Sequence, residues 1–184
     1  MSPAVNISAE LSPGEIYARL AWIKGLNVEL LAGNVVVRGG SPVERARTVW
    51  RLTRALVPRV TAMNAAIFFK AVTPVRATGD ILRPDLAVVP HGLAGLDASD
   101  LYLVAEVVSC STARDDRCVK PQIYARGGVP LYLLVDAETV TVFGDLGGGS
   151  YRSRSTVTVG EKLTLPEPFG IELDTGGLIP EAGP

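Results

Sequence analysis

The chain has 184 residues, of which 47% are hydrophobic and 20% are charged, and its net charge is −1. This length and composition are typical of one globular domain with a sizeable core. The near-neutral charge excludes binding to nucleic acid through the charge of the whole chain, so DNA or RNA would need a local patch. Two cysteines, Cys110 and Cys118, and one histidine, His91, exclude a disulfide scaffold, a structural zinc site and a multi-histidine metal centre.

The hydropathy pattern predicts no membrane-spanning segment. No apolar stretch reaches the roughly 20 residues that a membrane helix needs. No secretory signal precedes the first expected helix. We therefore expect a cytoplasmic protein that makes no contact with a membrane.

The first third of the sequence predicts a helix, a hairpin and a second helix. A capping box with proline at the first helical position opens a helix over residues 12–24. Residues 26–31 and 35–38 are strand-like segments that flank a Gly-Asn turn, which predicts a β-hairpin. Ser-Pro at 41–42 starts the second helix, which we expect to end just before Pro58.

The middle of the sequence predicts a strand, helix, strand unit. Residues 66–72 and 86–89 are strand-like, with a loop between them around the proline at 74. Residues 101–109 form a nearly unbroken apolar run, which is typical of a buried strand. A helix is expected from about residue 115 to 127, followed by another buried strand over 131–135. A crossover of this kind is right-handed and predicts a parallel pair of strands.

The last predicted strands cover 139–143 and 151–159, and the final residues, about 25, are expected to form an irregular tail packed on the core. The chain, 1–184, is predicted to be a single domain. Its parts are the N-terminal helices and hairpin (1–60), a core with the candidate site residues (61–145), and a C-terminal strand with the tail (146–184). Because the hairpins favour antiparallel strands, we expect a mixed β-sheet flanked by helices, of the α/β or α+β class.

Glu106 is a lone carboxylate within the apolar run over 101–109. A buried carboxylate is costly unless a cation or hydrogen-bond donors compensate it. Two partners are available: Asp85, at the start of a preceding strand, and Lys120, fourteen residues after Glu106. Two carboxylates and a lysine on two strands and a helix indicate a divalent metal site for hydrolysis of phosphate esters. With the carbonyl of Val107, Asp85 and Glu106 would provide ligands for Mg²⁺ or Mn²⁺.

The helix over 115–127 would complete this site. Asp116, Lys120 and Tyr124 are spaced i, i+4, i+8 and lie roughly on one face. From that face Lys120 would orient the attacking water and stabilise negative charge on the phosphate. Ser109, at the end of the apolar run, would hydrogen-bond a metal ligand or a bound phosphate.

These residues resemble one large bacterial family. Arg83-Pro84-Asp85, then Glu106-Val107-Val108-Ser109, then Asp116, Lys120 and Tyr124 are together similar to the Uma-two type of restriction endonuclease, within the PD-(D/E)XK nuclease superfamily. The segment Val28-Glu29-Leu30 resembles that family's hairpin, and the region from Tyr151 to Phe169 is also similar. The likeness therefore covers most of the chain.

The resemblance implies a restriction-endonuclease-like fold and a Mg²⁺-dependent endonuclease, with Mn²⁺ as the alternative ion. It implies that Asp85, Glu106 and Lys120 are catalytic, that Glu29 lies near them, and that the product carries a 5′-phosphate. It also implies a nucleic acid substrate, with DNA favoured, and a frequent homodimer.

Three positions depart from the expected pattern. The Glu-x-Lys element of the superfamily reads Glu106-Val107-Val108 here, so the lysine is supplied by Lys120 on the next helix. Arg45 stands where the family often has a histidine, and Cys110 stands where a proline is common. The last two changes leave open a narrowed or lost activity.

Most of the candidate residues also have a purely structural interpretation. Asp85 can begin a strand or close a turn, and Glu106 can form a structural ion pair with Arg83 or Lys120. Asp116 with Lys120 is also an ordinary helix pair.

The same holds for the outer residues. Tyr124 can be a core residue, and Glu29 can be a charge at the end of a strand. His91 is expected on the surface, and Cys110 with His91 is disfavoured as a nucleophile and base because nothing orients the pair.

Five arginines are candidates for contact with a nucleic acid backbone. Three share a face of the second helix and two lie at the start of the third, and a solvated helix face is the alternative interpretation. They are Arg47, Arg51 and Arg54, and Arg114 and Arg117.

The sequence favours a metal-dependent nuclease over two alternatives. One is a nuclease-like dimeric binding or regulatory module with little or no catalysis, and the other is a hydrolase of a small phosphate ester. A basic groove leading to Asp85 would favour nucleic acid, and a closed pocket would favour a small ligand. Carboxylates too far apart to share a cation would favour the binding module.

Overall fold

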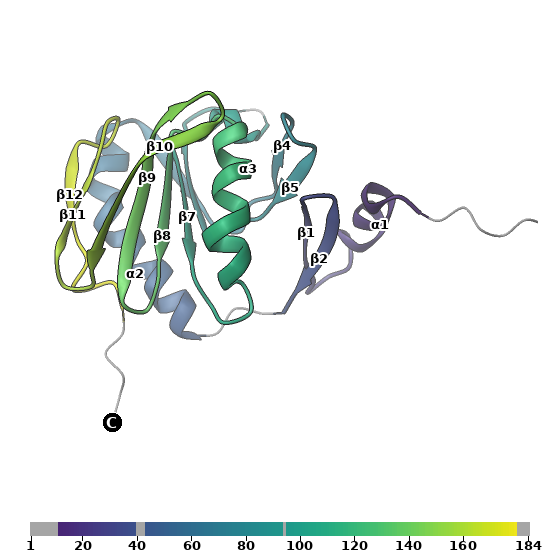
Figure 1. Ribbon diagram of the computed structural model, residues 1–184, viewed down its shortest axis with the longest axis horizontal. Coiled ribbons are helices and arrows are strands. Elements are labelled where there is room, and N and C mark those ends of the chain that lie inside the picture. Colours follow the sequence, from purple (N-terminus) through teal and green to yellow (C-terminus); the bar gives the residue numbers. More distant parts are fainter. Residues whose placement is uncertain (1–10, 40–42, 94, 180–184) are drawn as a thin grey trace, which may run out of the picture.

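The computed structural model describes residues 11–39, 43–93 and 95–179 of the chain (Figure 1). Its helical elements are α1 (Pro13–Leu20), α2 (Val43–Ala62), η1 (Ala98–Asp100), η2 (Asp115–Val119) and α3 (Lys120–Arg126). Its strands are β1 (Asn27–Leu31), β2 (Asn34–Arg38), β3 (Ala65–Phe68), β4 (Thr73–Val75), β5 (Asp80–Leu82), β6 (Leu86–Pro90), β7 (Leu103–Val107), β8 (Leu131–Val135), β9 (Thr139–Gly147), β10 (Ser150–Thr158), β11 (Lys162–Leu165) and β12 (Ile171–Asp174). None of the described helices is long and apolar enough to cross a membrane.

A six-stranded sheet forms the centre of the molecule, in the order β10-β9-β8-β7-β6-β3. β7 and β8 run parallel, with Leu103 opposite Leu131, and the other neighbouring pairs of this sheet are antiparallel. The parallel pair is connected through α3, as the strand, helix, strand pattern predicts. The predicted mixed sheet flanked by helices is therefore confirmed.

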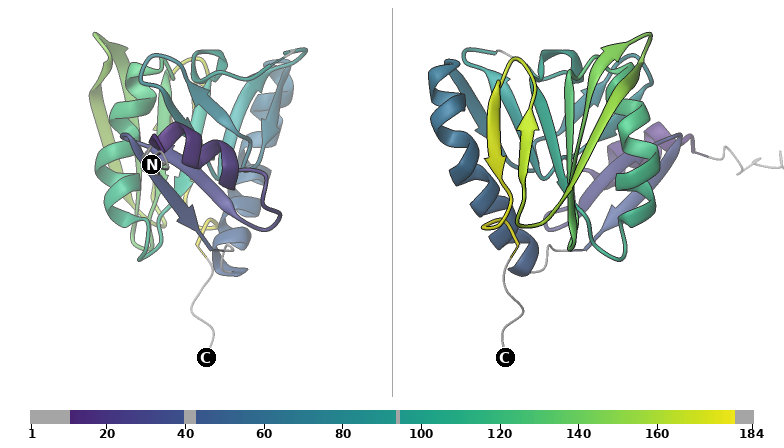
Figure 2. Two further views of the ribbon diagram at one scale, coloured as in Figure 1. Left: turned by 90° about the vertical axis from the view of Figure 1, so that its right-hand side faces the viewer. Right: turned by 60° about the vertical axis from the view of Figure 1, so that its left-hand side comes forward.

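Helices cover both faces of this sheet, α3 on one side and α2 on the other (Figures 1 and 2). Successive side chains of a strand point to opposite faces. On β7, Leu103 and Ala105 pack in the core beneath α2, whereas Val104 packs in the core beneath α3. Glu106 follows the same alternation, so its carboxylate lies on the α3 side.

A second sheet, in the order β2-β1-β5-β4, lies beside the first. The predicted hairpin forms its first two strands, with Asn27 opposite Arg38. Residues around Pro74, which were expected to form a loop, form β4 and β5 instead. Strands of three residues are too short for an alternating pattern to be recognised. Leu31 and Leu82 pack in the core beneath α3, which brings this sheet to the side of Glu106.

The helix α2 continues through Pro58 to Ala62, so the prediction that Pro58 ends it is wrong. Leu52, Leu56 and Val60, spaced i, i+4, i+8, are buried against the sheet. Burial of this stripe stabilises the helix beyond the proline and offsets the loss of one backbone hydrogen bond. The predicted helix start at 41–42 lies outside the described residues.

The C-terminal segment forms a hairpin, so the predicted irregular tail is wrong. β11 and β12 pair in antiparallel fashion, with Leu163 opposite Leu173. Leu163, Leu165 and Leu173 are buried in the core on the α2 side. The two strands have four residues each and are flanked by glycine and proline, which conceals their alternation in the sequence.

Replacement of Leu163 tests this packing. We expect Leu163→Ala to lower the free energy of unfolding by about 2–5 kcal/mol, because it leaves a cavity in the core. The matched control is Lys162→Ala on the exposed side of the same strand, which should change it by less than about 0.5 kcal/mol. Urea unfolding followed by circular dichroism measures both values, and equal effects would contradict the packing of β11.

Candidate active site

Glu106 lies near the end of β7 and is fully buried, with 0% of its surface exposed. The ammonium of Lys120, the first residue of α3, donates a hydrogen bond to Glu106 Oε1 at 2.7 Å. Lys120 is itself only 2% exposed. The helix that connects the two parallel strands thus carries the cation that the buried carboxylate requires, as the sequence predicts.

Lys120 also contacts two other carboxylates. Its Nζ lies 3.0 Å from Asp116 Oδ1 and 3.4 Å from Glu29 Oε1. A π-helical turn precedes α3, and in it the amide of Lys120 donates to the carbonyl of Asp115. Such turns are rare and are frequent at functional sites. Asp116 and Lys120 therefore meet at one buried point where the π-helical turn joins α3.

Asp85 lies just before β6 and beside Glu106, and it is buried. The amide of Val107 donates to Asp85 Oδ2 at 2.8 Å, and the amide of Asp85 donates to Glu106 Oε2 at 3.4 Å. The antiparallel register of β6 and β7, with Leu86 opposite Ala105, brings the two residues together. The two carboxylates that the sequence singles out are therefore neighbours.

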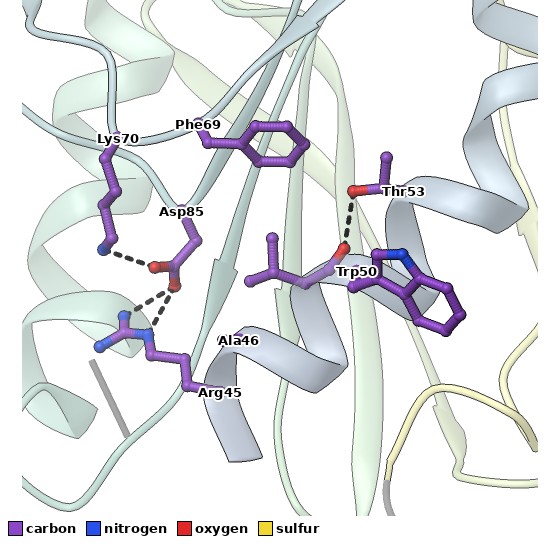
Figure 3. A pocket seen from close by; sticks show the side chains of 8 residues that line it. Arg45, Ala46, Trp50, Thr53, Phe69, Lys70 and Asp85 are labelled. Atoms are coloured by element: carbon purple, nitrogen blue, oxygen red, sulfur yellow. Dashed lines mark hydrogen bonds and ion pairs between the residues drawn. The ribbon is translucent and has the colours of Figure 1, made fainter. Parts of the chain in front are cut away.

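Two cations from other elements neutralise Asp85 (Figure 3). Arg45 Nη2, from the start of α2, lies 2.7 Å from Asp85 Oδ2 and 3.8 Å from Glu106 Oε2. Lys70 Nζ lies 2.5 Å from Asp85 Oδ1. Because the guanidinium of Arg45 faces both carboxylates, Asp85 and Glu106 are close enough to share a cation.

The backbone of Lys70 is fixed against the segment that contains Asp85. Its φ is 50°, in the left-handed region that residues other than glycine seldom adopt. Its amide donates to the carbonyl of Pro84 at 3.0 Å, and its carbonyl accepts from Arg83 Nε at 3.2 Å. Unusual backbone conformations that the surrounding contacts enforce cluster at functional sites.

Arg38, on β2, closes the other side of the site. Its guanidinium lies 2.8 Å from Glu29 Oε2 and 2.8 Å from Asp115 Oδ2. The amide of Arg83 donates to Glu29 Oε1 at 2.9 Å. We call the resulting network the carboxylate cluster. Its acidic members are Glu29, Asp85, Glu106, Asp115 and Asp116, and its cationic members are Arg38, Arg45, Lys70 and Lys120.

Burial and neighbouring charges set the ionisation of the cluster. Burial raises the pKa of Glu106 to about 8, and Asp85, Asp116 and Glu29 add to this effect although Lys120 opposes it. Burial also opposes ionisation of Asp85, but Lys70 and Arg45 prevail and hold its pKa below the usual range. Burial opposes the charge of Lys120 too, yet the surrounding carboxylates raise its pKa, so Lys120 is protonated at neutral pH.

A groove with a volume of about 1110 Å³ adjoins the cluster on the side of Val107. It carries cationic, hydroxyl and acidic side chains, so it is mixed in charge rather than strongly basic. They include Arg38, Arg45, Arg47, Ser109, Ser111, Thr112, Glu44, Asp115 and Asp136. The hydroxyl of Ser109 bonds with those of Ser111 and Thr112, at 3.3 and 2.9 Å, rather than with the carboxylate pair.

Tyr124 is a core residue. It is buried, and its ring stacks on Tyr132 with the centroids 5.7 Å apart. Its hydroxyl makes no hydrogen bond with any group in the described parts of the chain. Burial raises the pKa of this hydroxyl well above its usual value, so it remains protonated.

The five arginines proposed for contact with nucleic acid are dispersed. Arg47 lines the groove. Arg54 lies over the ring of Trp50 at 4.8 Å, and Arg117 is paired with Asp136. Arg51 is half-buried and Arg114 is exposed. His91, Cys110 and Cys118 are exposed, as expected for His91.

Sequence reasoning missed Lys70 and Arg38, and it noted Arg45 only as a departure from the family. One signal for Arg38 is present, because the hairpin register places Glu29 opposite Val36, so that Arg38 is a diagonal neighbour on the same face. No local pattern indicates that Lys70 or Arg45 approaches Asp85, from which they are 15 and 40 residues distant in the chain.

The residues present fit a divalent cation at Asp85 and Glu106. Mg²⁺ is usually bound by one or two carboxylates together with water and substrate phosphate, rather than by a full cage of protein ligands. Within the described residues, no three or more potential ligands converge as such a cage. Asp85 and Glu106 could provide such a smaller set of ligands, and the guanidinium of Arg45 now lies beside both.

The mixed sheet and its flanking helices form an α+β fold. The same fold occurs in a solved structure described as a "putative nuclease belonging to DUF820" from Anabaena variabilis ATCC 29413. That chain superposes with a TM-score of 0.72 at 13% identity, over 91% of this chain and 97% of its own. The Uma2 family model, described as "Putative restriction endonuclease", matches residues 15–176. The chain belongs to the Uma2 family.

Two other comparisons add little. A chain of the DrdV–DNA complex has a TM-score of 0.34 at 13% identity, over 63% of this chain and 12% of that chain, which is too low to support a structural argument. No curated protein matches the sequence significantly.

The pKa of Glu106 predicts a dependence of stability on pH. The folded protein raises this pKa from 4.5 to about 8, so the folded state favours the protonated form. The corresponding stability is fully present below pH 4.5 and is lost as the pH rises through about 8. We expect the free energy of unfolding, measured with urea at pH values between about 5 and 8.5, to fall further in the wild type than in Glu106→Gln. Parallel pH profiles would contradict this ionisation.

Proposed function

We propose that the chain is a divalent-metal-dependent endonuclease that hydrolyses phosphodiester bonds of nucleic acid. Its active-site residues would be Asp85, Glu106 and Lys120. One observation carries the proposal: two buried carboxylates share a cation at 2.7 and 3.8 Å and lie beside a fixed lysine. Metal-assisted hydrolysis of a phosphate ester uses a divalent cation and a positive charge placed for the transition state, and this arrangement suits both. Membership of the Uma2 family supports the same class of reaction.

Asp85, Glu106 and the carbonyl of Val107 would hold Mg²⁺ or Mn²⁺. When bound, the ion supplies a water of lowered pKa and neutralises charge on the scissile phosphate. The amide of Val107 holds Asp85 Oδ2 in place at 2.8 Å, which limits the rearrangement that ligation requires. Because the pKa of Glu106 is about 8, this carboxyl would have to lose a proton before it could hold the ion at neutral pH.

Lys120 would orient the attacking water and stabilise negative charge on the phosphate. Its raised pKa keeps it protonated, so it provides a fixed positive charge rather than a general base. Contacts with Glu106, Asp116 and Glu29 fix its ammonium before substrate binds. A donor that is already oriented costs little reorganisation in the transition state. Asp116 and Glu29 are therefore positioning residues.

Arg45 and Lys70 would change partners during binding. Both neutralise Asp85, so a divalent cation at Asp85 competes with both. Once released, the guanidinium and the ammonium lie at the mouth of the site, where substrate phosphates would bind. The planar fork of Arg45 matches the oxygens of a phosphate in particular.

We propose that nucleic acid, with DNA favoured by the family, follows the groove beside Val107. Its volume of about 1110 Å³ exceeds what a small phosphate ester needs. Arg47 and the hydroxyl of Ser109 line the groove and would contact backbone phosphates, with Arg114 as a further exposed candidate. A homodimer, as the family implies, would bring a second copy of the site to the other strand.

A binding module without catalysis is the second candidate. One observation favours it: protein cations already contact Asp85 and Glu106, and Arg45 takes the position that a metal would need. If Arg45 and Lys70 hold these positions permanently, the site is closed to metal and the fold serves only for binding.

Calorimetric titration of Mn²⁺ and Mg²⁺ separates the two candidates. We expect one site in the wild type, and Asp85→Asn should weaken the affinity by about 10-fold or more because a ligand is lost. Arg45→Ala should instead raise the affinity by about 10-fold, because it removes the competing cation. The matched control is Glu172→Gln, a carboxylate paired with Lys162 outside both the cluster and the groove, which should leave the affinity unchanged.

The same proteins are then assayed on labelled single-stranded and double-stranded DNA. Asp85→Asn should lower the rate of cleavage by at least about 100-fold, and Glu172→Gln should not. Failure of the wild type to bind Mn²⁺ even with DNA present would contradict the nuclease proposal and leave the binding module.

A further inference from the structure

A second cavity, with a volume of about 290 Å³, opens directly beside Asp85 (Figure 3). It lies between the first half of α2 and the segment that follows β3, and most of its wall is apolar. Its lining residues are Arg45, Ala46, Val49, Trp50, Thr53, Phe69, Lys70 and Asp85. No residue of this cavity other than Arg45 lines the large groove.

Two aromatic side chains of this cavity are open to solvent. Trp50 is 57% exposed and Phe69 is 52% exposed. Figure 3 shows Phe69 across the cavity from α2 and Trp50 at the end away from Asp85. The guanidinium of Arg54 lies 4.8 Å from the centre of the Trp50 ring. Exposed aromatic rings with a cation close by are the surfaces on which unpaired nucleic acid bases stack.

The opposite end of the cavity is charged. Lys70 and Arg45 approach Asp85 there, at 2.5 and 2.7 Å. Phe69 and Lys70 are consecutive, and successive side chains of an extended strand point in opposite directions. The left-handed backbone of Lys70, with a φ of 50°, turns the chain so that both side chains line one cavity. The cavity thus joins an apolar part to a part that carries two cations.

We propose that this cavity takes one unpaired nucleobase of the nucleic acid whose phosphate lies at Asp85. The inference rests on the proposed nuclease function and names its substrate class. A base in a duplex is stacked on both faces and paired along its edge, so it enters a cavity of this kind only when it is single-stranded or flipped out. The substrate at the cleavage site is therefore an unpaired nucleotide rather than regular duplex.

The charged end argues for a nucleotide over a second copy of the chain. A nucleotide joins an aromatic ring to a phosphate, and the cavity joins Trp50 and Phe69 to Lys70 and Arg45 in the same way. An apolar side chain from a partner subunit would cover the aromatic rings but would leave the two cations without an anion beyond Asp85.

The test compares two oligonucleotides of equal length in Mn²⁺, both with phosphorothioate linkages that resist cleavage, so that binding is measured with the metal present. One is single-stranded DNA and the other has the same backbone with every base removed. Fluorescence anisotropy of a terminal dye gives both affinities. We expect the wild type to bind the strand with bases at least about 5-fold more tightly than the abasic strand. Trp50→Ala should lose this preference and bind the abasic strand as the wild type does.

The matched control is Trp22→Ala, because Trp22 is 89% exposed and lies outside both cavities. It should retain the full preference. The chain has two tryptophans, so Trp22→Phe leaves Trp50 as the sole tryptophan, which is excited selectively at wavelengths that tyrosine does not absorb. We expect the strand with bases to quench its fluorescence and the abasic strand to leave it unchanged.

The outcomes separate this inference from the function on which it rests. Equal affinity of the wild type for both strands would overturn the base-binding cavity and leave a nuclease that contacts only the backbone. Absence of binding to either strand would overturn both. A dimer in sedimentation velocity that Trp50→Ala dissociates, while Trp22→Ala does not, would assign the cavity to a second copy instead.

Discussion

The burial of Glu106 is the constraint on which the rest of the site depends. A carboxylate with no exposed surface in the middle of a sheet requires a cation. The helix that joins β7 to β8 supplies it, because the ammonium of Lys120 lies 2.7 Å from Glu106 Oε1. The helix that connects the two parallel strands therefore also places the cation of the site. Removal of Lys120 would take away the ammonium that Glu106, Asp116 and Glu29 all contact.

The cluster around this pair joins elements that are distant in the chain. β1 and β2 contribute Glu29 and Arg38, α2 contributes Arg45, and the residues after β3 contribute Lys70. Burial raises the pKa of Glu106 to about 8, and the neighbouring carboxylates of Asp85, Asp116 and Glu29 add to this effect. The proposed hydrolysis of a phosphodiester requires this cluster to exchange a proton and the contact with Arg45 for a divalent cation.

The sequence predicts the local part of this arrangement and not the distant part. An apolar strand interrupted by Glu106 predicts a buried charge that needs a cation, and spacing on the next helix indicates Lys120. The roles of Arg45 and Lys70 depend on where α2 and β3 pack, which no local pattern specifies. Tertiary packing also explains why α2 continues past Pro58 and why the last segment forms a hairpin. Burial of Leu56, Val60 and Leu163 overrides the local signals at these two places.

The measurement that most directly tests this interpretation is anomalous diffraction from crystals grown with Mn²⁺ and a short phosphorothioate strand that resists cleavage. We predict one manganese peak between Asp85 and Glu106, with Arg45 moved from the carboxylates to a phosphate oxygen. Crystals in which the strand is bound, no manganese peak lies at these carboxylates and Arg45 keeps its contact with Asp85 would contradict a metal-dependent nuclease.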